Sequence, residues 1–383
     1  MEDENISNSS EKRKKKFRIW FTRFSSQTAE NFGWTIGGFT LAYDISGANG
    51  IIALFSSMLA MANFTTRRLR YSGNSLGPSL IRTALIWRGI SFIMMILAYQ
   101  SESLALLILG GGFSGVYVGS FWPAFYSIYE EDFKEWYSAE KTSAIILIIL
   151  SAVCLNYLGV FFVLAISFIF VIVSYISTLI IDTRPFHTRS QKGMSESLQL
   201  RKFSRSLSPP ERLAFFEGSL NSSTNLCRYL IILTGTVSIQ RLPEYISLGL
   251  ILAISQFLGA IFSWMFCSYL SDRGLIRVGL AICSFSTVLL MFESSWLFGI
   301  IILSCGSSVI FPVFKDEVDR QLADLSMGES CAREKSRNSG RLLAAIAGSI
   351  SWLSNPTTVG SAIPVMLSLV ALVYCWNNAN RGI

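Results

Sequence analysis

Apolar residues gather along the chain into runs of about twenty, with short polar stretches between the runs. A helix needs about 20 apolar residues to cross the hydrocarbon core of a bilayer. The pattern predicts twelve membrane-spanning helices, at residues 26–45, 48–65, 79–99, 104–127, 142–159, 161–182, 213–238, 245–269, 275–292, 296–314, 338–355 and 361–378. We therefore expect an all-α protein that lies in a lipid bilayer.

Composition agrees with this class and disfavours several others. Hydrophobic residues make up 51% of the chain and charged residues 15%, whereas soluble domains carry about 25% charged residues. The seven cysteines form no C-x-x-C pair, and His187 is the single histidine. We therefore expect no metal site and no other cofactor. A Walker-type phosphate-binding sequence is absent and no convergent catalytic set is visible, so we do not expect an enzyme.

The net charge of +7 is distributed unevenly about the predicted spans. Clusters of Lys and Arg precede span 1, follow spans 2, 4, 8 and 10, and fill the segment between spans 6 and 7. If the spans alternate, all these clusters fall on one side, and the opposite loops carry a single cation, Arg241. By the positive-inside rule we expect a multi-pass protein of the cell (inner or plasma) membrane with both termini in the cytoplasm. The same asymmetry argues against a nucleic-acid partner.

The chain divides into two halves of six spans each. We expect a basic cytoplasmic tail at 1–25 without a cleaved signal peptide, a six-helix bundle at 26–182, a Ser- and Arg-rich cytoplasmic linker at 183–212 and a second six-helix bundle at 213–383. Two pairs of similar short sequences occur at corresponding positions in the two halves. LIRTAL opens span 3 and LIRVGL opens span 9, while FWPAF and IFPVF end spans 4 and 10. They indicate a duplicated six-helix unit.

Twelve spans in two halves, with a basic central linker, resemble the major facilitator superfamily. Two local sequences carry the resemblance further. The loop after span 8 keeps Asp272, Arg273 and Arg277 of the family's signature, whereas the loop after span 2 has cations but no acid. The segment entering span 11 is similar to an R-E-x-x-x-N-x-G-R sequence of prokaryotic members, and the matching residues are Arg333, Glu334, Asn338, Gly340 and Arg341. The resemblance implies two pseudo-symmetric six-helix bundles, with spans 1, 4, 7 and 10 around a central cavity.

Polar residues within the spans supply candidates for a solute site, because such residues normally face the bundle interior or water. They recur at helical spacing in spans 1 and 7, which are corresponding helices of the repeat. The substrate-binding candidates are Arg228, Asn225, Asn221, Asn31, Gln27, Trp34, Tyr117, Trp122 and Gln256. For the amides, interhelical hydrogen bonds that only hold the bundle together are the alternative. For Tyr117 and Trp122, anchoring of a span end at the membrane interface is the alternative.

Two carboxylates and two arginines are singled out for the charges they place in the spans. Glu30 and Glu217 are candidates for proton coupling, and the alternative is an acid favoured by the helix dipole. Sodium coupling stays open. Arg228 lies deep in span 7, so it is the candidate for contacting an anionic group or for a charge switch between the halves. For Arg88 in span 3 we favour a structural role, such as pairing with Asp44 or capping carbonyls.

Small residues in span 4 form a separate pattern. Gly111, Gly115 and Gly119 repeat every four residues, which lets two helix backbones approach closely in lipid. Pro123 and Pro312 end the corresponding spans 4 and 10 and are expected to kink or soften them. We expect a gating role for this pattern, and close packing without motion is the alternative.

These features predict a monomeric secondary active transporter of the major facilitator type. It would move a small polar or amphipathic solute by alternating access, coupled to a proton or ion gradient. A transport-inactive membrane scaffold, sensor or partner subunit is the alternative.

Overall fold

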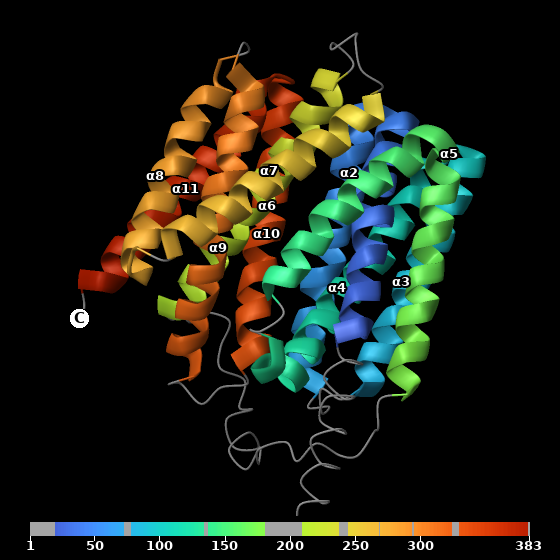
Figure 1. Cartoon of the computed structure of the whole chain (residues 1–383), viewed down its shortest axis with the longest axis horizontal. Helices are drawn as coiled ribbons and strands as arrows, with labels where there is room; N and C mark the ends of the chain where they lie inside the picture. The colour runs from blue at the N-terminus through green and yellow to red at the C-terminus, as the bar shows by residue number, and fades with distance from the viewer. Residues whose placement is uncertain are drawn as a thin grey trace, which may run out of the picture.

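The computed structural model of the chain describes residues 20–72, 78–133, 137–180, 209–236, 244–267, 269–292, 295–323 and 329–381 (Figure 1). Its elements are η1 (Glu30–Gly38), α2 (Phe39–Ser72), α3 (Pro78–Ser101), α4 (Leu104–Phe133), α5 (Tyr137–Ile180), α6 (Pro209–Thr236), α7 (Glu244–Cys267), α8 (Asp272–Leu290), α9 (Trp296–Ala323), α10 (Glu329–Ser354) and α11 (Thr358–Arg381). The tail at 1–19, His187 and most of the expected linker lie outside the described residues, so the domain boundaries stay predictions.

Two of these helices each carry two of the predicted spans. The backbone of α2 breaks at Ser46 and Gly47, where Gly47 has a φ of +59°, and that of α5 breaks at Gly159, where φ is +81°. A positive φ is readily adopted by glycine because it has no Cβ. Residues 20–29 are helical and continue through η1 into α2. With these breaks counted as boundaries, each of the twelve predicted spans overlaps a helix among the described residues, and the predicted fold class is confirmed.

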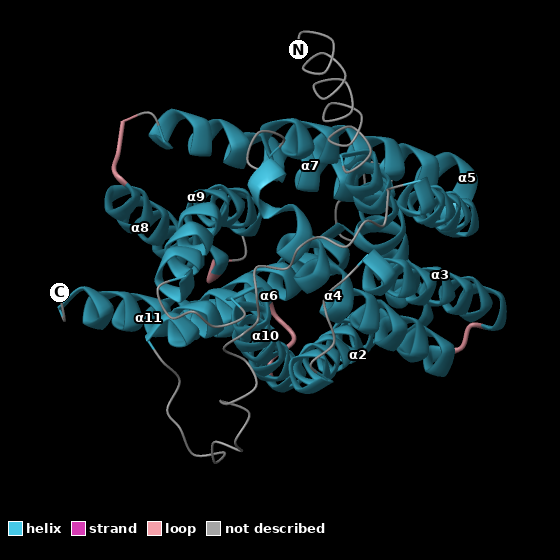
Figure 2. Cartoon of the chain, turned by 90° about the horizontal axis from the view of Figure 1, so that it is seen from below, coloured by secondary structure: helices cyan, strands magenta, loops and turns pink. Residues whose placement is uncertain are grey.

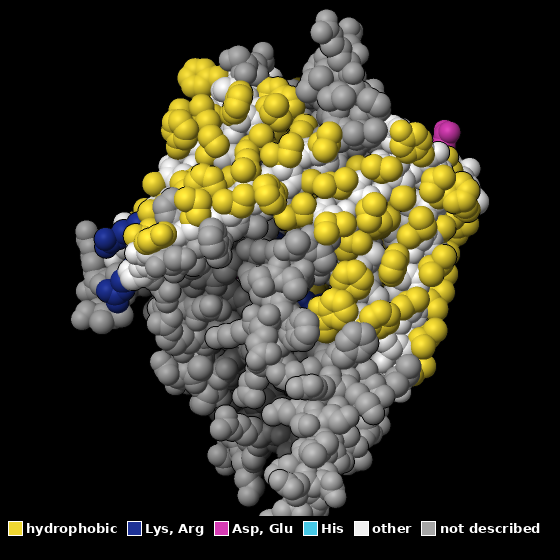
Figure 3. Space-filling model, in the orientation of Figure 1, with side chains coloured by type: hydrophobic (Ala, Val, Ile, Leu, Met, Phe, Trp, Pro, Cys, Tyr) yellow, Lys and Arg dark blue, Asp and Glu magenta, His cyan; other side chains and the backbone are white. Residues whose placement is uncertain are grey.

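The helices differ in how clearly their length and apolar composition mark them as membrane-spanning. Within the described residues, six helical stretches are long and apolar enough to cross a membrane, and the first of them, Trp20–Leu69, covers two predicted spans. Shorter apolar stretches lie at Gly249–Gly259 and Trp296–Ser307. The outer surface agrees with a lipid environment, because hydrophobic side chains cover the described part of the face in Figure 3 with few charges among them. Tyr157, Phe162 and Ile172 of α5 are among the large hydrophobic residues that are exposed on the protein surface.

The helices form two groups that lie side by side (Figures 1 and 2). The N-terminal half, residues 20–180, contains α2 to α5, and the C-terminal half, residues 209–381, contains α6 to α11. The halves meet through α2 and α10 and through α5 and α7. In the second contact, a Cβ at Gly249 would collide with the Ala152 side chain. These two helix pairs make the most extensive contacts between the halves, and α2 also meets α6.

The glycines of α4 lie against α2 at very short range. A Cβ at Gly111 would sit 2.8 Å from the Leu54 carbonyl oxygen, and one at Gly119 would sit 2.6 Å from the Ala62 carbonyl oxygen. A Cβ at Gly115 would meet the Met58 carbonyl. Because only glycine leaves room for these backbone atoms, the stripe brings the two helices into close contact. Pro123 is buried within α4, and the gating role stays a prediction.

Candidate functional site

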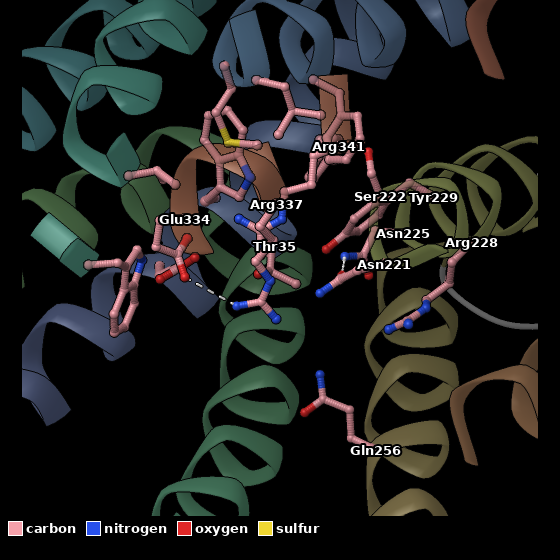
Figure 4. Close-up of a pocket in the computed structure, with 18 residues that line it drawn as sticks. Thr35, Asn221, Ser222, Asn225, Arg228, Tyr229, Gln256, Glu334, Arg337 and Arg341 are labelled. Atoms are coloured by element: carbon pink, nitrogen blue, oxygen red, sulfur yellow. Dashed lines mark hydrogen bonds and ion pairs between the residues drawn. The ribbon is translucent and has the colours of Figure 1, made fainter. Parts of the chain in front are cut away.

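A cavity of about 360 Å³ lies between the two halves (Figure 4). The N-terminal half lines it with Glu30, Trp34, Thr35, Phe39, Phe55, Met58, Leu59, Val118 and Trp122. The C-terminal half lines it with Asn221, Ser222, Asn225, Arg228, Tyr229, Gln256, Glu334, Arg337 and Arg341. Each half thus contributes nine of the lining residues. A volume of about 300–1,000 Å³ is usual for small-molecule sites.

A π-helical segment places three residues on the N-terminal wall. Residues 30–38, ENFGWTIGG, form η1 within the first predicted span. π-Helical turns are rare and occur often at functional sites. Glu30, Trp34 and Thr35 of this segment line the cavity. Gly33 lets the segment pack closely against its neighbours, because a Cβ at this position would collide with Phe92 and Ser167.

Helix α6 places polar side chains from successive turns on the opposite wall. Asn225 donates from Nδ2 to Asn221 Oδ1 at 2.8 Å, one helical turn away. Arg228 and Tyr229 follow on the next turn. The ring of Tyr229 stacks on Phe39 of α2 with centroids 3.9 Å apart, so an aromatic pair joins the two halves beside the cavity.

Helix α10 adds a cluster of charges that reaches α6. Arg337 Nη2 donates to Glu217 Oε1 at 2.5 Å, and Arg337 Nη1 donates to Glu334 Oε1 at 3.4 Å (Figure 4 shows the second bond). Arg333 Nε lies 3.6 Å from the same Glu334 oxygen. Arg337 was not a predicted site residue, although its spacing of three residues from Glu334 is that of a helical ion pair.

Hydrogen bonds between α2 and α10 join the two halves. We refer to the residues that form them as the α2–α10 contact: Asn63, Thr66, Arg67, Asn338 and Ser339. Asn338 donates from Nδ2 to Thr66 Oγ1 at 3.0 Å, and Ser339 donates from Oγ to Asn63 Oδ1 at 3.0 Å. Arg67 Nη2 adds a bond to Ser339 Oγ at 3.3 Å. The contact lies at the end of α2 that the charge pattern places near the cytoplasm.

The structure brings many of the predicted site residues together. Of the substrate-binding and proton-coupling candidates, the cavity is lined by Glu30, Trp34, Trp122, Asn221, Asn225, Arg228 and Gln256. Gln27, Asn31, Tyr117 and Glu217 are buried or partly buried next to it and are not among its lining residues. The roles assigned to all these residues stay predictions.

Tyr117 belongs to a buried cluster around Arg88, behind the N-terminal wall. The Arg88 side chain is 2% exposed and donates from Nη1 to Ser114 Oγ. Its guanidinium carbon lies 4.9 Å from the Tyr117 ring centroid and 5.5 Å from that of Trp34, within the usual cation–π range. Tyr117 hydroxyl is also 2.6 Å from Ser26 Oγ. Arg88 therefore supports a cavity-lining tryptophan from behind.

The residues of the family-like sequences lie in two places. Arg273 and Arg277 are exposed on the first turns of α8. Glu334 and Arg341 line the cavity, Asn338 is fully buried, and Gly340 packs against the Phe215 carbonyl of α6. The segment predicted to enter span 11 is therefore already part of α10. The side chains of Asp272 and Pro312 lie outside those that the structure describes.

Comparison of the whole chain with known proteins gives a likeness of fold. No protein-family model and no curated protein sequence matches the chain. Solved structures of transporters match it over nearly its full length, with 94% of this chain covered in three cases. The chain has the major facilitator fold.

The matching structures carry different solutes according to their names. A variant of the nucleoside transporter NupG has a TM-score of 0.64 at 14% identity, with 98% of that chain covered. A bacterial homologue of the iron transporter ferroportin, in an inward-facing state, has a TM-score of 0.61 at 14% identity, with 97% covered. The E. coli fucose:proton symporter FucP has a TM-score of 0.56 at 12% identity, with 97% covered. At such low identity the likeness concerns the fold, and the solute has to be argued from the cavity.

Proposed function

We propose that the chain is a secondary active transporter that moves a small solute by alternating access. The observation that carries this proposal is the cavity between the halves, because each half supplies nine of its lining residues. A solute held there contacts both halves, so a rocking motion of one half against the other would expose it to the two membrane faces in turn. The likeness to nucleoside, fucose:proton and iron transporters supports the same activity.

The contacts between the halves near the cavity fit such a cycle. The α2–α10 contact lies toward the predicted cytoplasmic end, and the Phe39–Tyr229 stack joins the halves beside the cavity. Opening toward the cytoplasm would break a few hydrogen bonds, each contributing only about 0.5–1.5 kcal/mol net. We place both termini in the cytoplasm, and we take the monomer in the cell membrane as the working unit.

A proton is the favoured coupling ion, and Glu30 is its proposed carrier. Glu30 is the only acid among the residues with which the described N-terminal half lines the cavity. A carboxylate beside a solute can pick up and release a proton as its access to water changes. Sodium is the alternative ion, since carboxylate and hydroxyl oxygens are both present.

Counterflow in proteoliposomes tests the proposal. The full chain is reconstituted, loaded with unlabelled solute, and exposed to labelled nucleosides, sugars, amino acids and organic anions in turn. We expect exchange of at least one solute, and accumulation of that solute when a pH gradient is imposed. Protein that binds no solute and exchanges none would instead support the scaffold, sensor or partner-subunit alternative. Arg68→Gln, an exposed position on α2 outside the cavity, is the matched control variant.

A further inference from the structure

The two walls of the cavity differ in chemistry. Seven of the nine N-terminal residues are apolar or aromatic, and the tryptophans Trp34 and Trp122 are among them. Apart from Tyr229, the nine C-terminal residues are amides, a serine, arginines and a glutamate. A solute that satisfies both walls must itself have an apolar side and a polar side.

The polar wall favours negative charge. Three arginines line the cavity against two glutamates. Glu334 is bonded to Arg337, whose other nitrogen is held by Glu217. Arg341 donates to Asn338 Oδ1 at 3.1 Å. The charges of Arg337, Glu334 and Glu217 therefore partly balance one another within the protein, whereas the bond from Arg341 goes to a neutral amide.

Arg228 stands apart from these pairs. Its Nε is enclosed and has no hydrogen-bond partner among the described residues. In Figure 4 its guanidinium extends toward the part of the cavity where the amides of Asn225 and Gln256 lie. The residue as a whole is partly exposed to the cavity, and an enclosed donor without an acceptor costs free energy that a bound acceptor would recover. A carboxylate or phosphate offers two oxygens that match its fork of N–H donors.

The amides next to Arg228 extend the same preference. Because the Asn225 amide nitrogen is bonded to Asn221 Oδ1, the amide nitrogen of Asn221 keeps its donors for other partners. Gln256 presents a further amide from α7. Amide N–H groups and a guanidinium together form a donor-rich surface suited to an anionic head group.

A metal cation fits this lining poorly, even though an iron-transporter homologue shares the fold. Dications of the hard class are held by several oxygen ligands, with carboxylates prominent among them. The described residues contain no group of three or more His, Cys, Asp or Glu side chains that could hold a metal ion. The arginines on the cavity wall would also repel a dication.

We infer that the transported solute is a small organic anion with a flat apolar body. Its carboxylate, or a comparable anionic group, binds Arg228 and the neighbouring amides, and its ring lies against the aromatic wall of the N-terminal half. The volume of about 360 Å³ limits the body to a small one. This inference rests on the proposed function, and it adds the class of solute that the cavity selects.

Matched ligands separate the contributions of charge and ring. Thermal unfolding of the purified full chain is followed with indole-3-acetate, with indole-3-acetamide of the same ring and size, and with acetate, which lacks the ring. We expect indole-3-acetate to bind roughly 10- to 100-fold more tightly than the amide, the usual range for a hydrogen bond to a charged group. Acetate should bind weaker by a similar factor, about 10- to 100-fold, because the ring is no longer buried.

Two variants then locate the anionic group. Arg228→Gln should reduce the preference for indole-3-acetate over the amide to within about twofold, since the remaining donors are neutral. Gln256→Leu, which removes a neutral donor from the same surface, should weaken both ligands and keep most of the preference. Arg68→Gln serves as the control and should bind all three ligands like the wild type.

Several outcomes would overturn the inference. It is wrong if uridine, L-fucose or Mn²⁺ stabilises the wild type and no anion of the set does, and also if no anion shifts the unfolding temperature at all. An anion preference that survives in Arg228→Gln would move the site elsewhere and overturn it too. Exchange of a neutral solute in proteoliposomes would leave the proposed transport function standing. Tight indole-3-acetate binding without any counterflow would contradict the transport function and leave standing only that the cavity binds an aromatic anion.

Discussion

Arg337 Nη2 lies 2.5 Å from Glu217 Oε1, and this ion pair ties α10 to α6 inside the C-terminal half. The two side chains are 12% and 4% exposed, so water screens the pair only weakly. The sequence suggested Glu217 as a proton carrier on the cavity face. In the structure its carboxylate has an arginine partner and is not among the lining residues, so a stabilising role can be tested beside the predicted proton coupling.

Glu217→Gln should lower the stability of the protein by about 1.5–3 kcal/mol, the usual contribution of a hydrogen bond to a charged group, because Arg337 loses Glu217 and keeps its bond to Glu334. Thermal unfolding in detergent measures the change. The double variant Glu217→Gln, Arg337→Gln should recover part of the loss, and a double-mutant cycle gives the coupling between the two side chains. Purely additive losses would contradict a direct interaction.

Glu30→Gln should separate transport from coupling. The variant should still exchange solute in counterflow, because solute exchange requires no net proton movement. Accumulation driven by a pH gradient should be lost. Glu30 also interacts electrostatically with Arg88, so a fold check by thermal unfolding accompanies the assay. Glu102→Gln, in the turn between α3 and α4, is the matched acid control, and equal accumulation by both variants would exclude Glu30 as the carrier.

The glycine stripe of α4 allows a paired test within one helix. At Gly115 an added Cβ would lie 2.8 Å from Met61 Cβ and 2.9 Å from the Ala62 nitrogen, whereas at Gly112 the nearest atom is Met61 Cγ at 3.5 Å. Gly115→Ala should therefore destabilise the protein or force α4 away from α2. Gly112→Ala should be neutral or stabilising by up to about 1 kcal/mol, the usual difference in helix propensity. Unfolding temperatures that move equally would argue against the close contact.

The α2–α10 contact should control access to the cavity from the predicted cytoplasmic end. Asn338→Ala removes the donor to Thr66 and the acceptor for Arg341, so the closed arrangement loses stability relative to the open one. In a background without native cysteines, a cysteine placed at Asn225 should then react faster with a membrane-impermeant thiol reagent added to inside-out vesicles. An unchanged rate would mean that other contacts hold this end closed. Thr65→Ala on α2, outside the named hydrogen bonds, is the control.

The span pattern and the division into halves were readable from the residues alone, and seven of the proposed binding and coupling residues line the cavity. Most of them were identified because they are polar residues within a segment that is otherwise apolar enough to lie in lipid. The contacts of Arg88 could not be predicted from the sequence. Its position in span 3 suggested pairing with Asp44 or carbonyl capping, whereas its guanidinium lies among Ser114 and the rings of Tyr117 and Trp34. Phe39 and Tyr229 gave no signal, since aromatic residues are common throughout the spans.

A membrane-spanning helix can be recognised from its own stretch of sequence, because lipid requires the same two properties of each span. The span needs an apolar surface and a backbone that satisfies its own hydrogen bonds. Length, polarity and charge sidedness follow from these requirements residue by residue. The meeting of Arg337 with Glu217, of Asn338 with Thr66 and of Phe39 with Tyr229 depends on how each helix is rotated and tilted. Rotation and tilt are set by side-chain packing between helices distant in the chain, so the cavity and its contacts emerge only when the two halves are assembled.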